Sequence, residues 1–206
     1  SRILARCLGD TELSATTDEI NEAARRVSGL VEALSTSVAP IDIERVATDL
    51  PELISSVASD LDQGSSSAVA VRCVGTLSRV MLDPEHVRMA VREVLETAVR
   101  FSGGGPVIID VRVIEDRVRI QVVDSGPGFS ERALEHAFQP FFSDQDAGRR
   151  TGLGLARALR LVDAHGGTIV TRNDPRGGAV VSIFLPFLAA AAHPDRLPDR
   201  GSRRVA

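Results

Sequence analysis

The chain of 206 residues is poor in residue types on which several common classes of binding site depend. It has seven Phe but no Tyr and no Trp, which argues against the aromatic stacking platforms that bind single-stranded nucleic acid. Its formal net charge of −4 gives no overall basic character, so nucleic acid is not an expected partner. The two cysteines, Cys7 and Cys73, are too few for a disulfide framework and lack zinc-site spacing. A reducing, cytoplasmic setting is therefore expected.

Long apolar segments are also missing. The longest run, about residues 179–192, is interrupted by Ser182 and Pro186 and is shorter than the ~20 residues that a membrane-spanning helix needs. No signal peptide opens the chain, which starts with Ser rather than Met. We therefore expect a cytoplasmic piece of a longer protein, any membrane anchor of which lies upstream. With 43% hydrophobic and 25% charged residues, the composition suits a folded domain with appendages.

The two ends of the chain differ from its middle. Residues 1–38 are expected to be helical, because Ile20, Val27 and Leu34 recur every seven positions and Gly9-Asp10 breaks the pattern once. This spacing favours a helical hairpin that forms a dimer, while a helix packed on its own domain is the alternative. Residues 188–206 are rich in Ala, Pro, Asp and Arg and are expected to form a flexible tail.

Residues 39–187 are expected to form one domain of alternating helices and strands. Helices are predicted over residues 42–61, 85–102 and 156–164. Strands are predicted over residues 68–74, 107–113, 118–123, 168–172 and 179–185. This order predicts an α/β (α+β) sandwich, in which one mixed, mainly antiparallel sheet carries helices on one face.

Two glycine-containing segments suggest a ligand. Asp124-Ser125-Gly126-Pro127-Gly128 follows an apolar strand, so Asp124 can accept a hydrogen bond from an exocyclic amine while the glycines allow close backbone approach. A plain turn explains this segment equally well. Residues 149–155, Arg-Arg-Thr-Gly-Leu-Gly-Leu, open a helix whose N–H groups can receive phosphate. A plain helix cap is the alternative there.

The predicted helix over residues 85–102 carries a third polar feature. Glu93 and Thr97 stand four residues apart on one polar face, away from the apolar stripe. Glu93 can act as a base or position a water molecule, and the Thr97 hydroxyl can help to hold a hydrated Mg²⁺. An ordinary solvated helix face explains the same residues.

The order of these motifs resembles the catalytic ATP-binding domain of two-component sensor histidine kinases, within the ATPase superfamily that includes gyrase and MutL. Residues 93–102 resemble the N box, residues 124–128 the first glycine box, residues 138–142 the F box and residues 151–155 the second glycine box. The resemblance covers residues 41–186. Residues 1–38 would then be the end of the dimerisation and phosphoacceptor hairpin.

The resemblance implies an ATP-dependent protein-histidine kinase that binds Mg-ATP and transfers the γ-phosphoryl to a histidine, for relay to a response regulator aspartate. Asp124 would bind the adenine amino group, Glu93 would be the catalytic base, and Glu93 with Thr97 would hold Mg²⁺. The kinase would be a homodimer through its N-terminal helices. The nucleotide-binding residues would be Glu93, Thr97, Asp124, Gly126, Gly128, Thr151, Gly152, Leu153, Gly154 and Leu155.

The chain departs from the family pattern in two ways. The N box usually has Asn at the positions of Glu93 and Thr97, and Thr97 offers one neutral oxygen on a shorter arm than the Asn amide that ligates Mg²⁺. The four histidines all lie outside a phosphoacceptor motif, so the acceptor is expected upstream. Two alternatives follow: a degenerate, non-catalytic signalling or scaffold module, and an anti-sigma-factor serine kinase.

Overall fold

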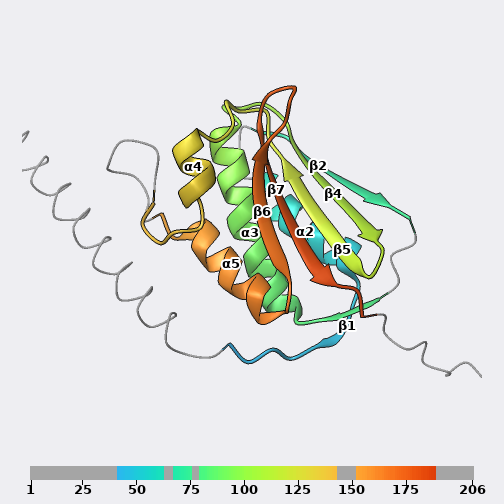
Figure 1. Ribbon diagram of the computed structural model, residues 1–206. Coiled ribbons are helices and arrows are strands. Elements are labelled where there is room, and N and C mark those ends of the chain that lie inside the picture. The colour runs from blue at the N-terminus through green and yellow to red at the C-terminus, as the bar shows by residue number, and fades with distance from the viewer. Residues whose placement is uncertain (1–40, 63–66, 76–78, 143–151, 189–206) are drawn as a thin grey trace, which may run out of the picture.

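The computed structural model describes residues 41–62, 67–75, 79–142 and 152–188 (Figure 1). The predicted hairpin of residues 1–38 and almost all of the predicted tail lie outside these described residues. The elements are β1 (Val46–Thr48), α2 (Leu50–Asp62), β2 (Val69–Val74), β3 (Val80–Leu82), α3 (Pro84–Phe101), β4 (Val107–Ile114), β5 (Arg117–Val123), α4 (Glu131–His136), α5 (Gly154–Ala164), β6 (Thr168–Asn173) and β7 (Ala179–Pro186).

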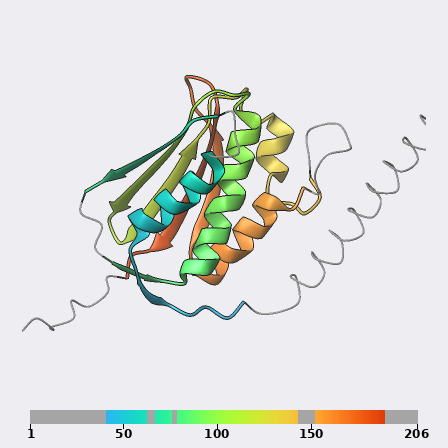
Figure 2. The same cartoon turned by 180° about the vertical axis from the view of Figure 1, so that it is seen from behind.

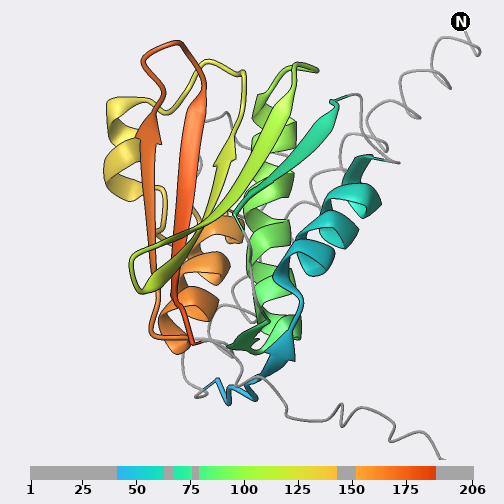
Figure 3. The ribbon, with the colours of Figure 1, turned by 90° about the vertical axis from the view of Figure 1, so that its right-hand side faces the viewer.

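A five-stranded sheet of order β2-β4-β5-β7-β6 forms the main layer, and β1 pairs with β3 in a separate two-stranded sheet. Only the pairing of β2 with β4 is parallel; the other described pairings are antiparallel. Helices α2, α3 and α5 form a second layer on one face of the large sheet (Figures 2 and 3). The predicted sandwich is therefore confirmed. None of the described helices is long and apolar enough to cross a membrane.

The core lies between the sheet and these three helices. Alternate residues of β4 and β5 point inward, so Ile109, Val111 and Ile120 are fully buried, while Asp110 and Arg112 between them face the other way. Helix α3 lies in the middle and packs against both α2 and α5. Its apolar stripe consists of Val87, Ala90, Val91, Val94, Leu95 and Ala98. This stripe fixes the rotation of α3 and leaves Glu93 and Thr97 on its polar side.

Polar contacts fix the N-terminal end of α3. Asp83 caps the helix, since its Oδ1 accepts from the backbone N–H of His86 at 3.1 Å and its Oδ2 from that of Glu44 at 3.0 Å. Desolvation by burial raises the pKa of Asp83, but these bonds and the His86 side chain outweigh it and hold the pKa below its usual value. The buried Nε2 of His165, at the end of α5, accepts from the Asp83 N–H at 3.3 Å. One capping residue therefore joins α3, α5 and the segment before β1.

The predicted helix over residues 42–61 was wrong at its beginning. Residues in its first part form the extended strand β1, and α2 begins only at Leu50. Asp49 ends the extended segment, because its Oδ1 accepts from the Glu52 N–H at 3.0 Å and so provides a helix start. Strands β1 and β3, of three residues each, and the six-residue helix α4 were not predicted, because segments this short carry no readable periodicity.

Candidate functional site

Asp124 lies directly after β5 and is 7% exposed. Its Oδ1 accepts two backbone hydrogen bonds, from Gly126 at 2.8 Å and from Ala179 at 3.0 Å. Its Oδ2 forms no hydrogen bond with any residue that the structure describes. The carboxylate of a buried aspartate is expected to have hydrogen-bond partners. Because its Oδ1 bonds hold the Asp124 side chain in place, Oδ2 is suited to accept a hydrogen bond from a ligand N–H.

The glycines around Asp124 are needed for close packing within the protein. A Cβ on Gly126 would overlap the carbonyl oxygen of Phe101, the last residue of α3, and a Cβ on Gly178 would overlap the backbone oxygen of Asp124 itself. Gly128, at φ +83°, would place a Cβ 2.8 Å from Oδ1 of Asn173. The first glycine box is thus packed between the end of α3 and the β6–β7 turn.

Asn173, at the end of β6, is a site residue that sequence reasoning missed. Its Oδ1 accepts from the Phe129 N–H at 2.7 Å and its Nδ2 donates to the Phe129 carbonyl at 2.9 Å. These two bonds hold the loop after Gly128 against β6. The partners are 44 positions apart and Asn173 belongs to none of the sequence motifs, so no local pattern identified it.

Helix α5 begins without the side-chain cap that α3 and α4 have. Leu153 occupies its N-cap position and provides no capping hydrogen bond, whereas Asp83 and Ser130 cap the other two helices. The first turn of α5 also contains no acidic residue. N–H groups left without a side-chain acceptor at a helix N-terminus favour an anion. Leu153 and Leu155 are themselves buried, so their side chains belong to the core.

The F box and the second glycine box contact one another. The Phe141 N–H donates to the Gly152 carbonyl at 3.1 Å, and a Cβ on Gly152, at φ +65°, would lie 2.6 Å from the Phe142 carbonyl oxygen. Phe141 has φ +66°, a conformation unfavourable for a residue with a side chain, and is 43% exposed. The segment between these boxes, together with Thr151, lies outside the described residues.

The N box and the second glycine box lie side by side. A Cβ on Gly154 would be 3.0 Å from Oε2 of Glu93 and 3.8 Å from Oγ1 of Thr97. Oε1 of Glu93 accepts from Nη1 of Arg157 at 2.8 Å, an ion pair between α3 and α5. The structure therefore brings together Glu93, Thr97 and Gly154, and it adds Arg157, which sequence reasoning missed.

Glu93 and Thr97, the predicted Mg²⁺ residues, both form contacts within the protein. The Thr97 hydroxyl donates to the Glu93 backbone carbonyl at 2.9 Å, and its oxygen lies 3.4 Å from Nη2 of Arg100. The Glu93 carboxylate is already paired with a guanidinium. The described part of the chain contains no group of three or more His, Cys, Asp or Glu side chains that could hold a metal ion. Mg²⁺ bound through several carboxylates of this chain is thus not supported there.

This fold and site define a class of α/β sandwich with an aspartate after a central strand, a glycine segment opening a helix and a polar helix between them. The chain belongs to the histidine kinase-, DNA gyrase B- and HSP90-like ATPase family, whose model matches residues 82–189. The sequence resemblance to the catalytic domains of sensor histidine kinases is therefore confirmed.

Curated relatives in this family are named as sensor histidine kinases. The chain is 34% identical over 182 residues to the probable sensor histidine kinase HK of Mycobacterium tuberculosis (strain CDC 1551 / Oshkosh), a match that covers 85% of this chain and 47% of that protein. It is 32% identical over 168 residues to the sensor histidine kinase ZraS of Klebsiella oxytoca, covering 79% of this chain and 36% of that protein. The chain thus spans less than half the length of either relative.

Solved structures with the same fold are also histidine kinases. Full-length ShkA in complex with AMPPNP superposes with a TM-score of 0.73 at 26% identity, covering 88% of this chain and 39% of that chain. ThkA in complex with the response regulator protein TrrA gives a TM-score of 0.68 at 25% identity, covering 82% and 49% of the two chains. The mixed sheet with its helical layer is therefore an architecture shared with histidine kinase catalytic domains.

Proposed function

We propose that this chain is the catalytic ATP-binding part of a sensor histidine kinase of a two-component system. The observation that carries the proposal is Asp124, a buried carboxylate with one oxygen saturated by backbone N–H groups and the other without a described partner. In the proposed complex, Oδ2 of Asp124 accepts from the exocyclic amine of adenine. The solved complex of the similar kinase ShkA with AMPPNP supports a nucleotide as the ligand.

The phosphates would extend from Asp124 toward the first turn of α5. Gly152 and Gly154 leave the backbone there without side chains, and the uncapped N–H groups of α5 favour phosphate oxygens. Phosphoryl transfer requires mainly that the reactants are positioned and that the charge is neutralised. Mg²⁺ would enter with ATP as part of the substrate, since the described residues contain no group of three or more His, Cys, Asp or Glu side chains that could hold the ion on its own.

Glu93 is the proposed catalytic base. It projects from the polar side of α3 next to Gly154, where the γ-phosphoryl would lie. A carboxylate at this position can accept the proton of an attacking nucleophile or orient that nucleophile. The accepting histidine would come from a helical hairpin whose last part is residues 1–38, with residues 39–187 as the catalytic domain and residues 188–206 as a tail.

The proposed partners follow from this assignment. Residues 1–38 would form a homodimer interface through their seven-residue apolar repeat. A response regulator would receive the phosphoryl group on an aspartate, and the solved complex of the similar kinase ThkA with the response regulator TrrA supports such a partner. We place this reaction in the cytoplasm.

The experiment that tests the proposal is phosphoryl transfer from γ-labelled ATP in a longer protein that joins this chain to the proposed upstream helix of the hairpin. The expected product is an acid-labile, alkali-stable label that is absent in the Asp124→Asn variant. An acid-stable label would contradict the histidine kinase and indicate the serine kinase alternative.

A second candidate is the non-catalytic signalling module, which the engaged hydroxyl of Thr97 favours. Nucleotide binding without any label in the longer protein would support this candidate over the kinase. Restoring the family residue with Thr97→Asn tests the cause, because a gain of label would assign the missing activity to this position.

A further inference from the structure

Arg157 and Glu93 form an ion pair that joins two helices beside the proposed phosphate site. Nη1 of Arg157 lies 2.8 Å from Oε1 of Glu93, and the side chains are 37% and 22% exposed. The residues are 64 positions apart in sequence. Arg157 lies in the first turn of α5, where its N–H donates to the Leu153 carbonyl at 2.8 Å. Glu93, whose Oε2 would lie 3.0 Å from a Cβ on Gly154, connects the guanidinium to the beginning of α5.

This position is an unfavourable one for a cation on its own. The N-terminus of a helix carries a partial positive charge, so an arginine there is disfavoured unless an anion offsets it. Glu93 provides that anion from α3. Partly exposed ion pairs contribute little to the free energy of unfolding. A role in stability therefore explains the arginine at this position poorly. A guanidinium beside the start of α5 is instead a group that can bind a polyphosphate through charge-assisted hydrogen bonds.

The N-box residues give a second reason to expect a fixed cation here. Thr97, at the position where the family places an Asn ligand of Mg²⁺, donates its hydroxyl proton to a helix carbonyl 2.9 Å away. The described residues contain no carboxylate cluster that would hold the metal. A positively charged side chain is therefore a candidate to neutralise phosphate charge at this site.

We propose that Arg157 is a specificity-determining residue for the phosphates of the nucleotide. Its guanidinium, held in place by Glu93, supplies the positive charge at the second glycine box that a protein-bound Mg²⁺ would otherwise supply. Nucleotide binding by this chain is then only weakly dependent on Mg²⁺. The inference rests on the proposed function, because it assumes that the ligand carries phosphates.

The test is a calorimetric titration of the full chain with AMPPNP and with adenosine, each in Mg²⁺ and in excess EDTA. Arg157→Gln is expected to weaken AMPPNP binding by about tenfold in EDTA while leaving adenosine binding unchanged. Arg157→Lys keeps the charge and is expected to retain most of the affinity.

Arg92→Gln is the matched control. Arg92 pairs with Glu96 at 3.1 Å on the exposed side of the same helix α3, so its loss removes one arginine and one ion pair away from the site. AMPPNP affinity should not change. Circular dichroism and thermal unfolding of each variant verify that it is folded.

Three results would overturn the inference while leaving the proposed function intact. These are unchanged AMPPNP affinity in Arg157→Gln, equal weakening of AMPPNP and adenosine, and wild-type binding only in the presence of Mg²⁺. Failure of the proposed function has a different signature, in which the folded wild-type chain binds neither AMPPNP nor adenosine in any buffer.

Discussion

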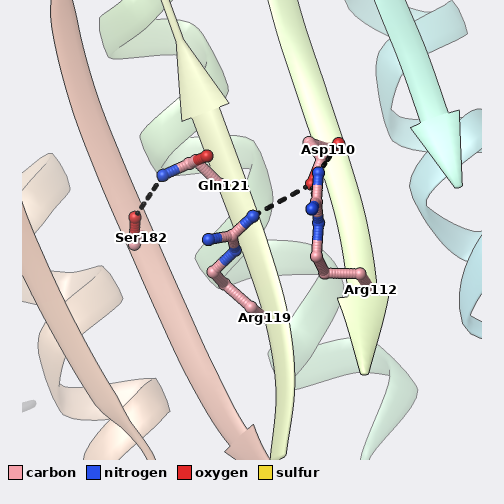
Figure 4. A network of polar contacts seen from close by, with 5 residues as sticks. All are labelled: Asp110, Arg112, Arg119, Gln121 and Ser182. Carbon is pink, nitrogen blue, oxygen red and sulfur yellow. Dashed lines mark hydrogen bonds and ion pairs between the residues drawn. The ribbon is translucent and has the colours of Figure 1, made fainter. Parts of the chain in front are cut away.

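Asp110 in β4 and Asp124 directly after the neighbouring strand β5 differ in how their carboxylate oxygens are hydrogen-bonded. Both oxygens of Asp110 are occupied by arginines: Nε and Nη2 of Arg112 lie 2.6 and 2.7 Å from Oδ1 and Oδ2, and Nη2 of Arg119 lies 3.2 Å from Oδ1 (Figure 4). Asp124 uses one oxygen for two backbone N–H groups and leaves Oδ2 without a described partner. A saturated carboxylate stabilises strands, and a half-saturated one is available to a ligand.

The two environments also differ in what surrounds the carboxylate. Asp110 faces away from the helical layer, where Gln121 Nε2 donates to Ser182 Oγ at 3.2 Å and continues the row of polar contacts across β5 and β7 (Figure 4). Hydrogen bonds from Arg112 and then from Arg119 hold the pKa of Asp110 below its usual value, against the opposing effect of burial. Asp124 has no arginine partner among the described residues, so an adenine amine would meet an unneutralised carboxylate.

The largest expected effect comes from breaking the backbone support of Asp124. Gly178→Ala should destabilise the protein by about 3 kcal/mol, because a Cβ there overlaps the Asp124 carbonyl and φ is +96°. Gly177 has a similar φ of +100°, but a Cβ on it would meet no atom within 4 Å, so Gly177→Ala should cost about 1 kcal/mol. Denaturant unfolding measures both. Equal effects would contradict the packing role of Gly178.

A third aspartate, Asp83, has both oxygens bonded to backbone N–H groups and has no arginine partner among the described residues. Its substitution therefore measures how much such a carboxylate contributes to the free energy of unfolding. Asp83→Asn should lower the free energy of unfolding by about 1–2 kcal/mol at pH 7, because an amide N–H₂ would face the Glu44 N–H. Asp49→Asn, on an exposed cap that Asn also provides, is the control and should change stability by less than ~0.5 kcal/mol.

The contribution of Asp83 to the free energy of unfolding should decrease at acid pH. Its folded-state pKa is lowered relative to the value of about 3.9 in an unfolded chain. Its contribution is therefore fully present above that value and is lost as the pH falls through the folded-state pKa. The difference in unfolding free energy between the wild type and Asp83→Asn should be constant from pH 7 down to about pH 4 and should narrow as the pH falls further. Parallel curves would contradict this assignment.

The smallest effect is expected on the arginine-saturated side of the comparison. Asp110→Asn should lower the free energy of unfolding by less than about 1 kcal/mol, because its partners are partly exposed and an Asn oxygen can still accept one of their bonds. Thermal unfolding in low and high salt measures it. A loss of several kcal/mol, or no change with salt in the difference between variant and wild type, would contradict a screened ion-pair role.

Local patterns predicted most of the fold. The apolar patterns of the long elements placed α3, β4, β5 and β7 correctly, because their buried faces are several turns or residues long. The apolar stripe of α3 also predicted that Glu93 and Thr97 lie on its polar side. The short elements β1, β3 and α4 were missed, since three to six residues cannot show a period.

The site was predictable in its motifs but not in its contacts. Asp124, the glycines and the N box were identified from their order along the chain. The Arg157–Glu93 pair and the Asn173–Phe129 contact join residues 64 and 44 positions apart, and no local spacing encodes such pairs. The close packing of Gly126 on the end of α3 was also not predictable from the sequence. A glycine required for close approach to a ligand and one required for close approach to backbone cannot be distinguished by sequence alone.

The measurement that tests the central claim most directly is the affinity of the full chain for AMPPNP in the matched variants Asp124→Asn and Asp110→Asn. We expect Asp124→Asn to weaken AMPPNP binding by about a hundredfold, because its amide N–H₂ would face the adenine amine. Asp110→Asn should bind AMPPNP like the wild type. Wild-type affinity in a folded Asp124→Asn variant, or equal losses in both variants, would contradict the assignment of Asp124 as the adenine-binding residue.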